Sequence, residues 1–226
     1  MNILVGDSRA KGLGSYYQLR GNLEVWAKSG AGIRAIEGMV NDHFIMYHGG
    51  QPLFTEKTHY YISAGICDMT KRIQSKPQQY EEVTYMDAPS ETLHKMTSQL
   101  KKIQTQVLNL GATPIFTTIY SLDLATWNNI RLNQRKTSVL NYESDYNSMQ
   151  IALNEAISLV NDAIITLNKN MMVATPMIHK CLLHNVRKGI KHWQYHKLVD
   201  GCHPNEPIKE DIANSLNRAI QLNRNL

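Results

Sequence analysis

With 226 residues, 42% of them hydrophobic and 19% charged, the chain is long enough to form one domain with a substantial hydrophobic core. This composition excludes a disordered or low-complexity chain. The longest apolar runs are interrupted within a few residues, so a membrane-spanning helix is not expected. A formal net charge of +5 slightly favours anionic partners, but it is too small to define a nucleic-acid-binding protein.

The N-terminus and the cysteines indicate the compartment in which the protein works. The first two residues lead directly into Ile3-Leu4-Val5, an apolar run that is too short for the core of a signal peptide. The three cysteines are scattered and odd in number, which favours free thiols in a reducing compartment over a disulfide scaffold. We therefore expect a cytoplasmic protein.

The N-terminal part of the chain is predicted to contain three short strands and one long helix. The strands are indicated by short apolar runs bounded by turn residues, and the helix by apolar residues spaced three and four apart. In chain order we expect a strand at residues 2–6, a loop running into a short helix at 9–20, a strand at 23–27, a helix opening at 29–32, and a strand at 59–63.

The rest of the chain is predicted to add two strands, three helices and two polar segments. Pro77 and Pro89 favour a loop, and Gly111 is placed to end the helix before it. In chain order we expect a surface loop at 71–90, a helix at 92–110, a strand at 113–119, a polar insertion or cap at about 120–147, a helix at 149–167, a strand at 171–174 and a helix at 208–222.

Strands that alternate with helices of this length imply a parallel sheet with helices on both faces. We therefore predict a single α/β domain over residues 1–226, a three-layer α/β/α sandwich around a central, mostly parallel five-stranded sheet. In such folds the chemistry lies at the carboxyl ends of the strands. Four short segments meet this condition: residues 7–8, 29–32, 65–68 and 200–203.

Gly6-Asp7-Ser8 follows the first predicted strand. A serine there can expose its hydroxyl while its own N–H points at the same spot, and a helix beginning at that point would favour a developing oxyanion. By itself the tripeptide is a weak signal, because a serine that caps a helix is very common.

Asp200-Gly201-Cys202-His203-Pro204 is the second motif. A serine nucleophile needs a base to take its proton and a partner that orients the base and stabilises its charge. An aspartate three residues before a histidine, in a tight turn that contains glycine, can supply both from one loop. A metal site is the alternative, but two ligands without a third cluster make a poor zinc site, and we expect no metal.

In this order along the chain, the motifs resemble the blocks of the SGNH (GDSL) hydrolase family. The blocks are Gly6-Asp7-Ser8, a glycine after the second strand, Gly65-Ile66-Cys67-Asp68 after the third strand, and the Asp-Gly-Cys-His-Pro motif near the C-terminus. The similarity spans nearly the whole chain. It implies the flavodoxin-like SGNH fold and the activity of a serine esterase, lipase or acetylhydrolase.

A narrower likeness involves the retroelement- or virus-associated branch of these esterases. The segments that look like the SGNH esterase modules of retroelements and related viral genes are Asp7-Ser8-Arg9, Ser29-Gly30-Ala31, residues 64–69, and the stretch from Thr117-Thr118-Ile119 through Trp127-Asn128.

The resemblance implies a role for each matching residue. Ser8 would be the nucleophile, His203 the base, and Asp200 the group that holds the imidazole. The oxyanion hole would use the N–H groups of Ser8 and Gly30, with Gly32 as the alternative glycine. The third donor of the family is an asparagine, and Cys67 stands in its place.

This replacement bears on the expected rate. A thiol is a weak hydrogen-bond donor, and the loss of one oxyanion donor costs roughly 10²–10³ in rate. The chain would then be a slow enzyme, unless a nearby side chain such as Arg9 substitutes. Cys67 as the nucleophile of a thiol enzyme is the other interpretation, although Ser8 is better placed in the pattern.

Several side chains are candidates for contact with the substrate. Asp68 also suits a turn or helix cap, and Trp127, between Asp123 and Asn128, can simply pack the insertion onto the domain. The four residues that we expect to contact the substrate are Arg9, Asp68, Trp127 and Trp193.

Two functions of different classes follow. The first is hydrolysis of a small-molecule, lipid or carbohydrate ester, without a cofactor. The second is a catalytically weakened module that binds nucleic acid or an anionic surface through basic residues around Trp193 and Tyr195, which can equally be a solvated hairpin or loop. The basic residues are Arg187, Lys188, Lys191, His192, His196 and Lys197.

Overall fold

The computed structural model describes most of the chain. The described residues are 1–48, 57–69, 71–76, 79–85, 88–135, 143–185 and 191–224. Within them, no helix is both long and apolar enough to cross a bilayer.

A parallel sheet lies at the centre of the fold. Its strands follow one another in the order β2-β1-β3-β6 and pair in parallel throughout. The carboxyl ends of all of them therefore meet at one edge of the sheet. The strands are β1 (Asn2–Gly6), β2 (Glu24–Ala27), β3 (His59–Ser63) and β6 (Thr113–Phe116).

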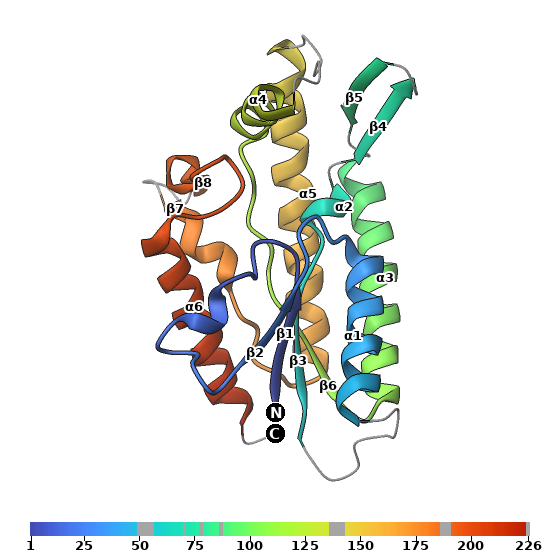
Figure 1. Ribbon diagram of the computed structural model, residues 1–226, viewed down its shortest axis with the longest axis vertical. Helices are drawn as coiled ribbons and strands as arrows, with labels where there is room; N and C mark the ends of the chain where they lie inside the picture. The colour runs from blue at the N-terminus through green and yellow to red at the C-terminus, as the bar shows by residue number, and fades with distance from the viewer. Residues whose placement is uncertain are drawn as a thin grey trace.

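The long helices divide between the two faces of this sheet (Figure 1). Side chains alternate along each strand. Ile3 and Val5 join a buried cluster with α1, α3 and α5, whereas Leu4 between them joins a cluster with α6. The result is three layers of helix, sheet and helix. The bounds are α1 (Ile33–His48), α3 (Pro89–Asn109), α5 (Glu143–Asn170) and α6 (Glu206–Asn223).

Shorter elements connect this framework. They are η1 (Leu13–Ser15), α2 (Ile66–Met69), β4 (Lys71–Lys76), β5 (Gln79–Tyr85), α4 (Leu124–Arg135), η2 (Ile178–Leu182), β7 (Leu183–Asn185), β8 (Lys191–Trp193) and η3 (Tyr195–Lys197).

The predicted three-layer α/β/α fold is confirmed, but the expected fifth strand at 171–174 is absent from the described sheet. Side-chain amides form the hydrogen bonds to the backbone that such a strand would form. Asn168 accepts a hydrogen bond from Phe116 N and donates one to Phe116 O, at 3.0 and 2.7 Å. Asn223 pairs in the same way with Ala174, at 2.7 and 3.1 Å. Asn168 therefore closes the edge of β6 at Phe116, and Asn223 holds the segment that contains Ala174.

An asparagine side chain that bonds to the backbone also shortens the fourth strand. We expected it to run through residue 119, but β6 ends at Phe116. Asn161 accepts a hydrogen bond from Ile119 N at 2.7 Å and donates one to Ile119 O at 2.8 Å. Thr117 N still donates a hydrogen bond to Ile62 O of β3, but the backbone at Ile119 is paired with a side chain of α5 and has left the sheet.

Two segments expected to be irregular contain regular structure. The predicted loop at 71–90 is instead the antiparallel hairpin β4–β5, followed by the start of α3, and Pro77 falls between the two strands. The predicted polar insertion carries the helix α4, for which Asp123 provides the cap: its carboxylate accepts hydrogen bonds from Thr126 N and Oγ1. Polar composition concealed both elements, because neither carries a continuous apolar pattern.

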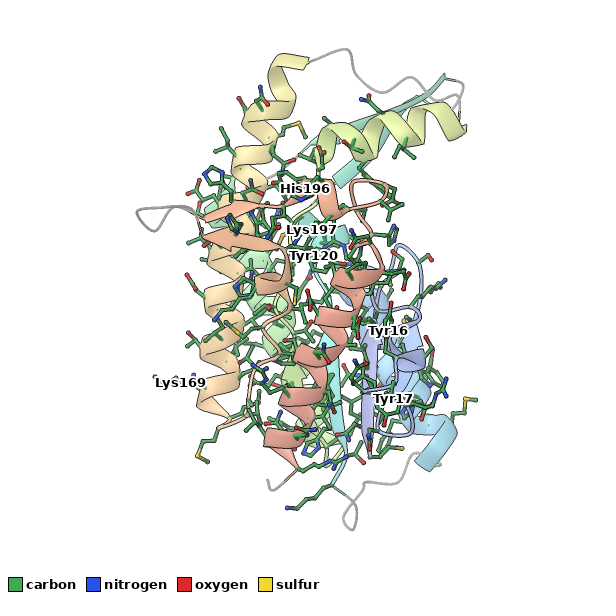
Figure 2. The ribbon with its side chains drawn as sticks, turned by 90° about the vertical axis from the view of Figure 1, so that its left-hand side faces the viewer. Tyr16, Tyr17, Tyr120, Lys169, His196 and Lys197 are labelled. Atoms are coloured by element: carbon green, nitrogen blue, oxygen red, sulfur yellow. The ribbon has the colours of Figure 1, made fainter. Side chains whose placement is uncertain are left out.

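The basic and aromatic segment near the C-terminus forms the hairpin β7–β8. Arg187 and Lys188 lie outside the described residues. His192 and His196 are exposed, and Figure 2 shows His196 and Lys197 close together in the upper part of the molecule. The structure thus contains the hairpin that we considered, and nucleic-acid binding by this segment stays a prediction.

Candidate active site

Ser8 lies directly beyond the carboxyl end of β1. The chain turns here because Asp7 Oδ1 accepts a hydrogen bond from Arg9 N at 2.8 Å and Asp7 O accepts one from Ala10 N at 3.1 Å. The turn leads into the short 3-10 helix η1 and not into an α-helix, so the expected helix N-terminus at Ser8 is absent. Ser8 is half-buried and is not a helix cap.

The loop before α6 holds Asp200 and His203 in a closed arrangement. Asp200 Oδ1 accepts hydrogen bonds from Cys202 N at 3.0 Å and His203 N at 2.7 Å. Gly201 between them has φ 75°, a conformation that side chains rarely adopt. Any Cβ at Gly201 would also lie 2.7 Å from Trp127 N. Glycine is therefore needed both for the turn and for close packing against α4.

These two ends of the chain meet. His203 Nε2 lies 2.8 Å from Ser8 Oγ, and His203 Nδ1 lies 2.7 Å from Asp200 Oδ2. A hydrogen-bonded chain thus runs from a carboxylate through an imidazole to a hydroxyl. The structure brings together the three residues that the two motifs had singled out.

Hydrogen bonding keeps Asp200 charged. Burial by itself would raise the pKa of this carboxyl, but hydrogen bonds from the backbone and ring of His203 and from Cys202 N outweigh it and hold the pKa below its ordinary value. An ionised Asp200 can orient the imidazole and stabilise its protonated form.

Gly30 follows the carboxyl end of β2 and has φ 70°. The hydrogen bonds found among the described residues include none from the N–H of Gly30 or of Ser8. Both donors are therefore available to a ligand. Gly32, the alternative glycine, is packed against Asp68 instead, since a Cβ there would lie 2.7 Å from Asp68 Oδ1.

Asp68 supports the start of α1. Its Oδ2 accepts a hydrogen bond from Ile33 N at 2.8 Å, which fills the capping role considered for it. Burial raises the pKa of this carboxyl, and the hydrogen bond from Ile33 opposes that rise. The carboxylate is thus engaged with the protein's own backbone, and contact with a substrate stays a prediction.

Cys67 directs its thiol at a neighbouring carboxylate: Sγ lies 4.0 Å from Asp7 Oδ2. Burial, together with the charge of Asp7, raises the pKa of Cys67 to about 12. The thiol is therefore protonated at neutral pH, which disfavours Cys67 as a nucleophile. Its Sγ also faces Asp7, and a thiol is a weak donor, so Cys67 is a poor third donor for an oxyanion.

Arg9 follows Ser8 in the chain and is buried, with an exposed fraction of 8%. Its Nη1 donates a hydrogen bond to Tyr120 O at 2.6 Å, and its guanidinium lies 4.1 Å from the centre of the Tyr120 ring. Tyr120, on the loop after β6, was not among the sequence candidates. This position favours a supporting role for Arg9 over direct contact with a substrate.

The two tryptophan candidates lie in different surroundings. Trp127 on α4 meets the ring of His203, with centroids 5.9 Å apart and an interplanar angle of 67°. Trp193 on β8 lines a separate groove of about 360 Å³ beside α5, together with Asn154, Glu155 and His179. The structure therefore brings Trp127 to His203, and it places Trp193 against another set of residues.

Sequence reasoning missed the asparagines that hold the loop after β6. Asn161 and Asn168 occur on the otherwise apolar stripe of α5, one heptad apart, and both are almost fully buried. Polar residues within a buried stripe are the signal that could have revealed them.

Among the described residues, no group of three or more His, Cys, Asp or Glu side chains could hold a metal ion.

Comparison with known proteins places this architecture in a class. No protein-family model matches the chain, and no curated protein matches its sequence. Solved structures do match over nearly its full length. One is a GDSL-like lipase from Bacteroides thetaiotaomicron, with 13% identity, a TM-score of 0.60, and 97% of this chain and 87% of that chain covered.

Two further matches show the range of proteins with this architecture. The lipase/acylhydrolase from Enterococcus faecalis has 11% identity, a TM-score of 0.55, and 97% and 94% coverage of this chain and that chain. The OSK domain of Drosophila Oskar has 15% identity, a TM-score of 0.53, and 96% and 86% coverage. The chain has the fold of the SGNH/GDSL hydrolases, as the motifs predicted.

Proposed function

We propose that the chain hydrolyses carboxylic esters through an acyl-enzyme on Ser8. One observation carries the proposal, namely the hydrogen-bonded chain from Asp200 through His203 to Ser8 Oγ. A shared fold does not by itself define an activity. The similarity to lipases and acylhydrolases agrees with the proposal, but the case rests on the geometry of these three side chains.

In the first half of the reaction, His203 Nε2 takes the proton of Ser8 as Oγ attacks the acyl carbon of the ester. Asp200 stabilises the imidazolium that forms. Collapse of the tetrahedral intermediate then breaks the bond to the alcohol, which leaves with the proton from His203. In the second half, water attacks the acyl-enzyme with His203 again as base, and the acid departs.

The negative charge of the tetrahedral intermediate needs hydrogen-bond donors. The N–H groups of Ser8 and Gly30 supply two, and neither is used by the described part of the chain. Cys67 stands where a third donor is expected, and its thiol is turned toward Asp7. A missing donor costs roughly 10²–10³ in rate, so we propose a slow esterase.

The substrate has an acyl group bound to oxygen or sulfur. An O-acetylated sugar, a lipid ester and a thioester all present the acyl carbon that this mechanism attacks. The steps use only groups of the protein and water, and they require no cofactor.

A direct test compares the wild type with three variants in hydrolysis of p-nitrophenyl acetate. We expect Ser8→Ala and His203→Ala to lower kcat by roughly 10³-fold or more, and Asp200→Asn to lower it by up to about 10⁴-fold. A fluorophosphonate probe should label the wild type at Ser8, as read by peptide mass spectrometry.

His184→Ala and Ser15→Ala are matched controls, because both residues are exposed and lie outside the triad. They should retain the wild-type rate. Equal rates for the wild type and Ser8→Ala would refute the acyl-enzyme mechanism.

A further inference from the structure

Arg9 presents a buried positive charge next to the proposed nucleophile in the chain. It is the residue after Ser8, and it is 8% exposed. Its guanidinium contacts the loop after β6 in two ways. Nη1 donates a 2.6 Å hydrogen bond to Tyr120 O, and the guanidinium carbon lies 4.1 Å from the centre of the Tyr120 ring. The loops that follow β1 and β6 are therefore joined by one side chain.

The loop after β6 is in turn joined to the loop that carries Asp200 and His203. Asp123 N donates a hydrogen bond to Gly201 O at 2.7 Å, and a Cβ at Gly201 would lie 2.9 Å from Asp123 O. A continuous path of contacts thus connects Arg9 with His203.

Cys202 adds a more direct connection. It is buried within the loop, between Asp200 and His203, and it lies close enough to the guanidinium to affect it electrostatically. Burial would lower the pKa of Arg9, but Cys202, Tyr120 and Asp7 together raise it. Arg9 is therefore charged at neutral pH.

This arrangement is not one that maximises stability. Beyond the bond to Tyr120 O and a contact with the Cys202 thiol, Nε and Nη2 of Arg9 have no nitrogen or oxygen partner in the described part of the chain, and neither does the hydroxyl of Tyr120. The cavity beside Arg9, of about 10 Å³, is lined in part by Asp7 and Tyr120 and has room for about one water molecule. A buried charge so incompletely paired costs free energy that an apolar side chain would not.

We propose that Arg9 is a positioning residue for the ester hydrolysis described above. By holding Tyr120 and facing Cys202, it fixes the loop of Ser8 against the loop of His203 and so maintains the 2.8 Å contact between Oγ and Nε2. It does not touch the substrate. The inference rests on the proposed function, because its effect is on the reactivity of Ser8.

The test compares Arg9→Met and Arg9→Lys with the wild type, using p-nitrophenyl acetate and the fluorophosphonate probe. A displacement of about 1 Å in a catalytic group can cost 10²-fold, so Arg9→Met should lose about 100-fold in kcat and in labelling rate, with KM within about twofold. Arg9→Lys keeps the charge and one donor group, and it should recover about tenfold of that loss.

A spectroscopic signal separates positioning from general damage. The proton between His203 and Asp200 is held within one loop, so its low-field NMR resonance should persist in Arg9→Met while Ser8 becomes unreactive. Arg20→Met is the matched control, since Arg20 is exposed, and it should behave as the wild type.

Each other outcome has a distinct meaning. A wild type that neither hydrolyses the ester nor labels at Ser8 refutes the esterase proposal itself. A reactive wild type with an equally reactive Arg9→Met refutes only the role of Arg9. Loss of the His203 resonance, or failure of both Arg9 variants to fold, would assign Arg9 an ordinary structural role and overturn the inference.

Discussion

The rings of Trp127 and His203 meet in an edge-to-face arrangement, with the two centroids 5.9 Å apart and an interplanar angle of 67°. Trp127 is half-buried and also packs against the main hydrophobic cluster. The proposed base therefore has a carboxylate on one nitrogen, a hydroxyl on the other, and an aromatic wall beside its ring. This wall limits the directions in which the imidazole can move.

Removal of the Trp127 ring should make the His203 imidazole more mobile and leave space beside it. We expect Trp127→Ala to lose about tenfold in kcat on p-nitrophenyl acetate, because an aromatic contact of this kind contributes about 0.5–1.5 kcal/mol to holding the ring. The relative rate on p-nitrophenyl octanoate should rise. Tyr17→Ala, at an exposed aromatic residue, is the control. An unchanged ratio between the two esters would exclude Trp127 from the substrate site.

A side-chain amide at position 67 should speed the reaction. Cys67→Asn replaces a weak donor with a strong one at the position where the family resemblance expects it, and a donor of this kind is worth roughly 10²–10³ in kcat. The measurement is kcat for p-nitrophenyl acetate, with Cys181→Asn as a control at a half-buried cysteine elsewhere. If a folded Cys67→Asn protein reacts at the wild-type rate, the proposal that the oxyanion hole lacks a third hydrogen-bond donor is wrong.

Stability should depend on pH through Asp200. Its pKa in the folded protein lies below the ordinary value of 3.8, so its hydrogen bonds contribute stability above that pH, and the contribution is lost as the pH falls through the folded-state pKa. Urea unfolding should show Asp200→Asn to be less stable than the wild type at pH 7. The difference should shrink toward pH 3, whereas a constant difference would contradict the assignment.

The bonds between Asn168 and the edge of β6 predict an effect on stability at a distance from the proposed catalytic groups. Asn168→Ala leaves both Phe116 N and Phe116 O without the side chain that now pairs with them. Since one unsatisfied buried backbone group costs about 1–3 kcal/mol, we expect a loss of about 2–4 kcal/mol in the free energy of unfolding.

Asn170→Ala is the control for this substitution, because Asn170 is exposed at the end of the same helix. It should unfold at nearly the same urea concentration as the wild type. An equally stable Asn168→Ala protein would show that the amide bonds to Phe116 are replaceable.

Much of this architecture follows from patterns that act over a few residues. Short apolar runs predicted β1 and β3 with the bounds that the structure has, and the spacing of apolar residues located α3, α5 and α6. The two motifs also identified Ser8, Asp200 and His203. Such patterns are readable because neighbouring residues decide which face of a strand or helix is buried.

Other features depend on partners far away in the chain, and local patterns do not contain them. The fifth strand is missing because Asn168 and Asn223 bond the backbone that a strand would have used. The 2.8 Å contact between Ser8 and His203 joins residues 195 positions apart.

The orientation of side chains was likewise decided by packing. Cys67 faces Asp7, Arg9 lies under Tyr120, and Trp127 meets His203. The sequence by itself determined which residues have the right chemistry and which strands deliver them to one edge of a sheet. Only the tertiary structure decided which of them are in contact, because close packing and hydrogen bonds between distant segments determine the distances between their side chains.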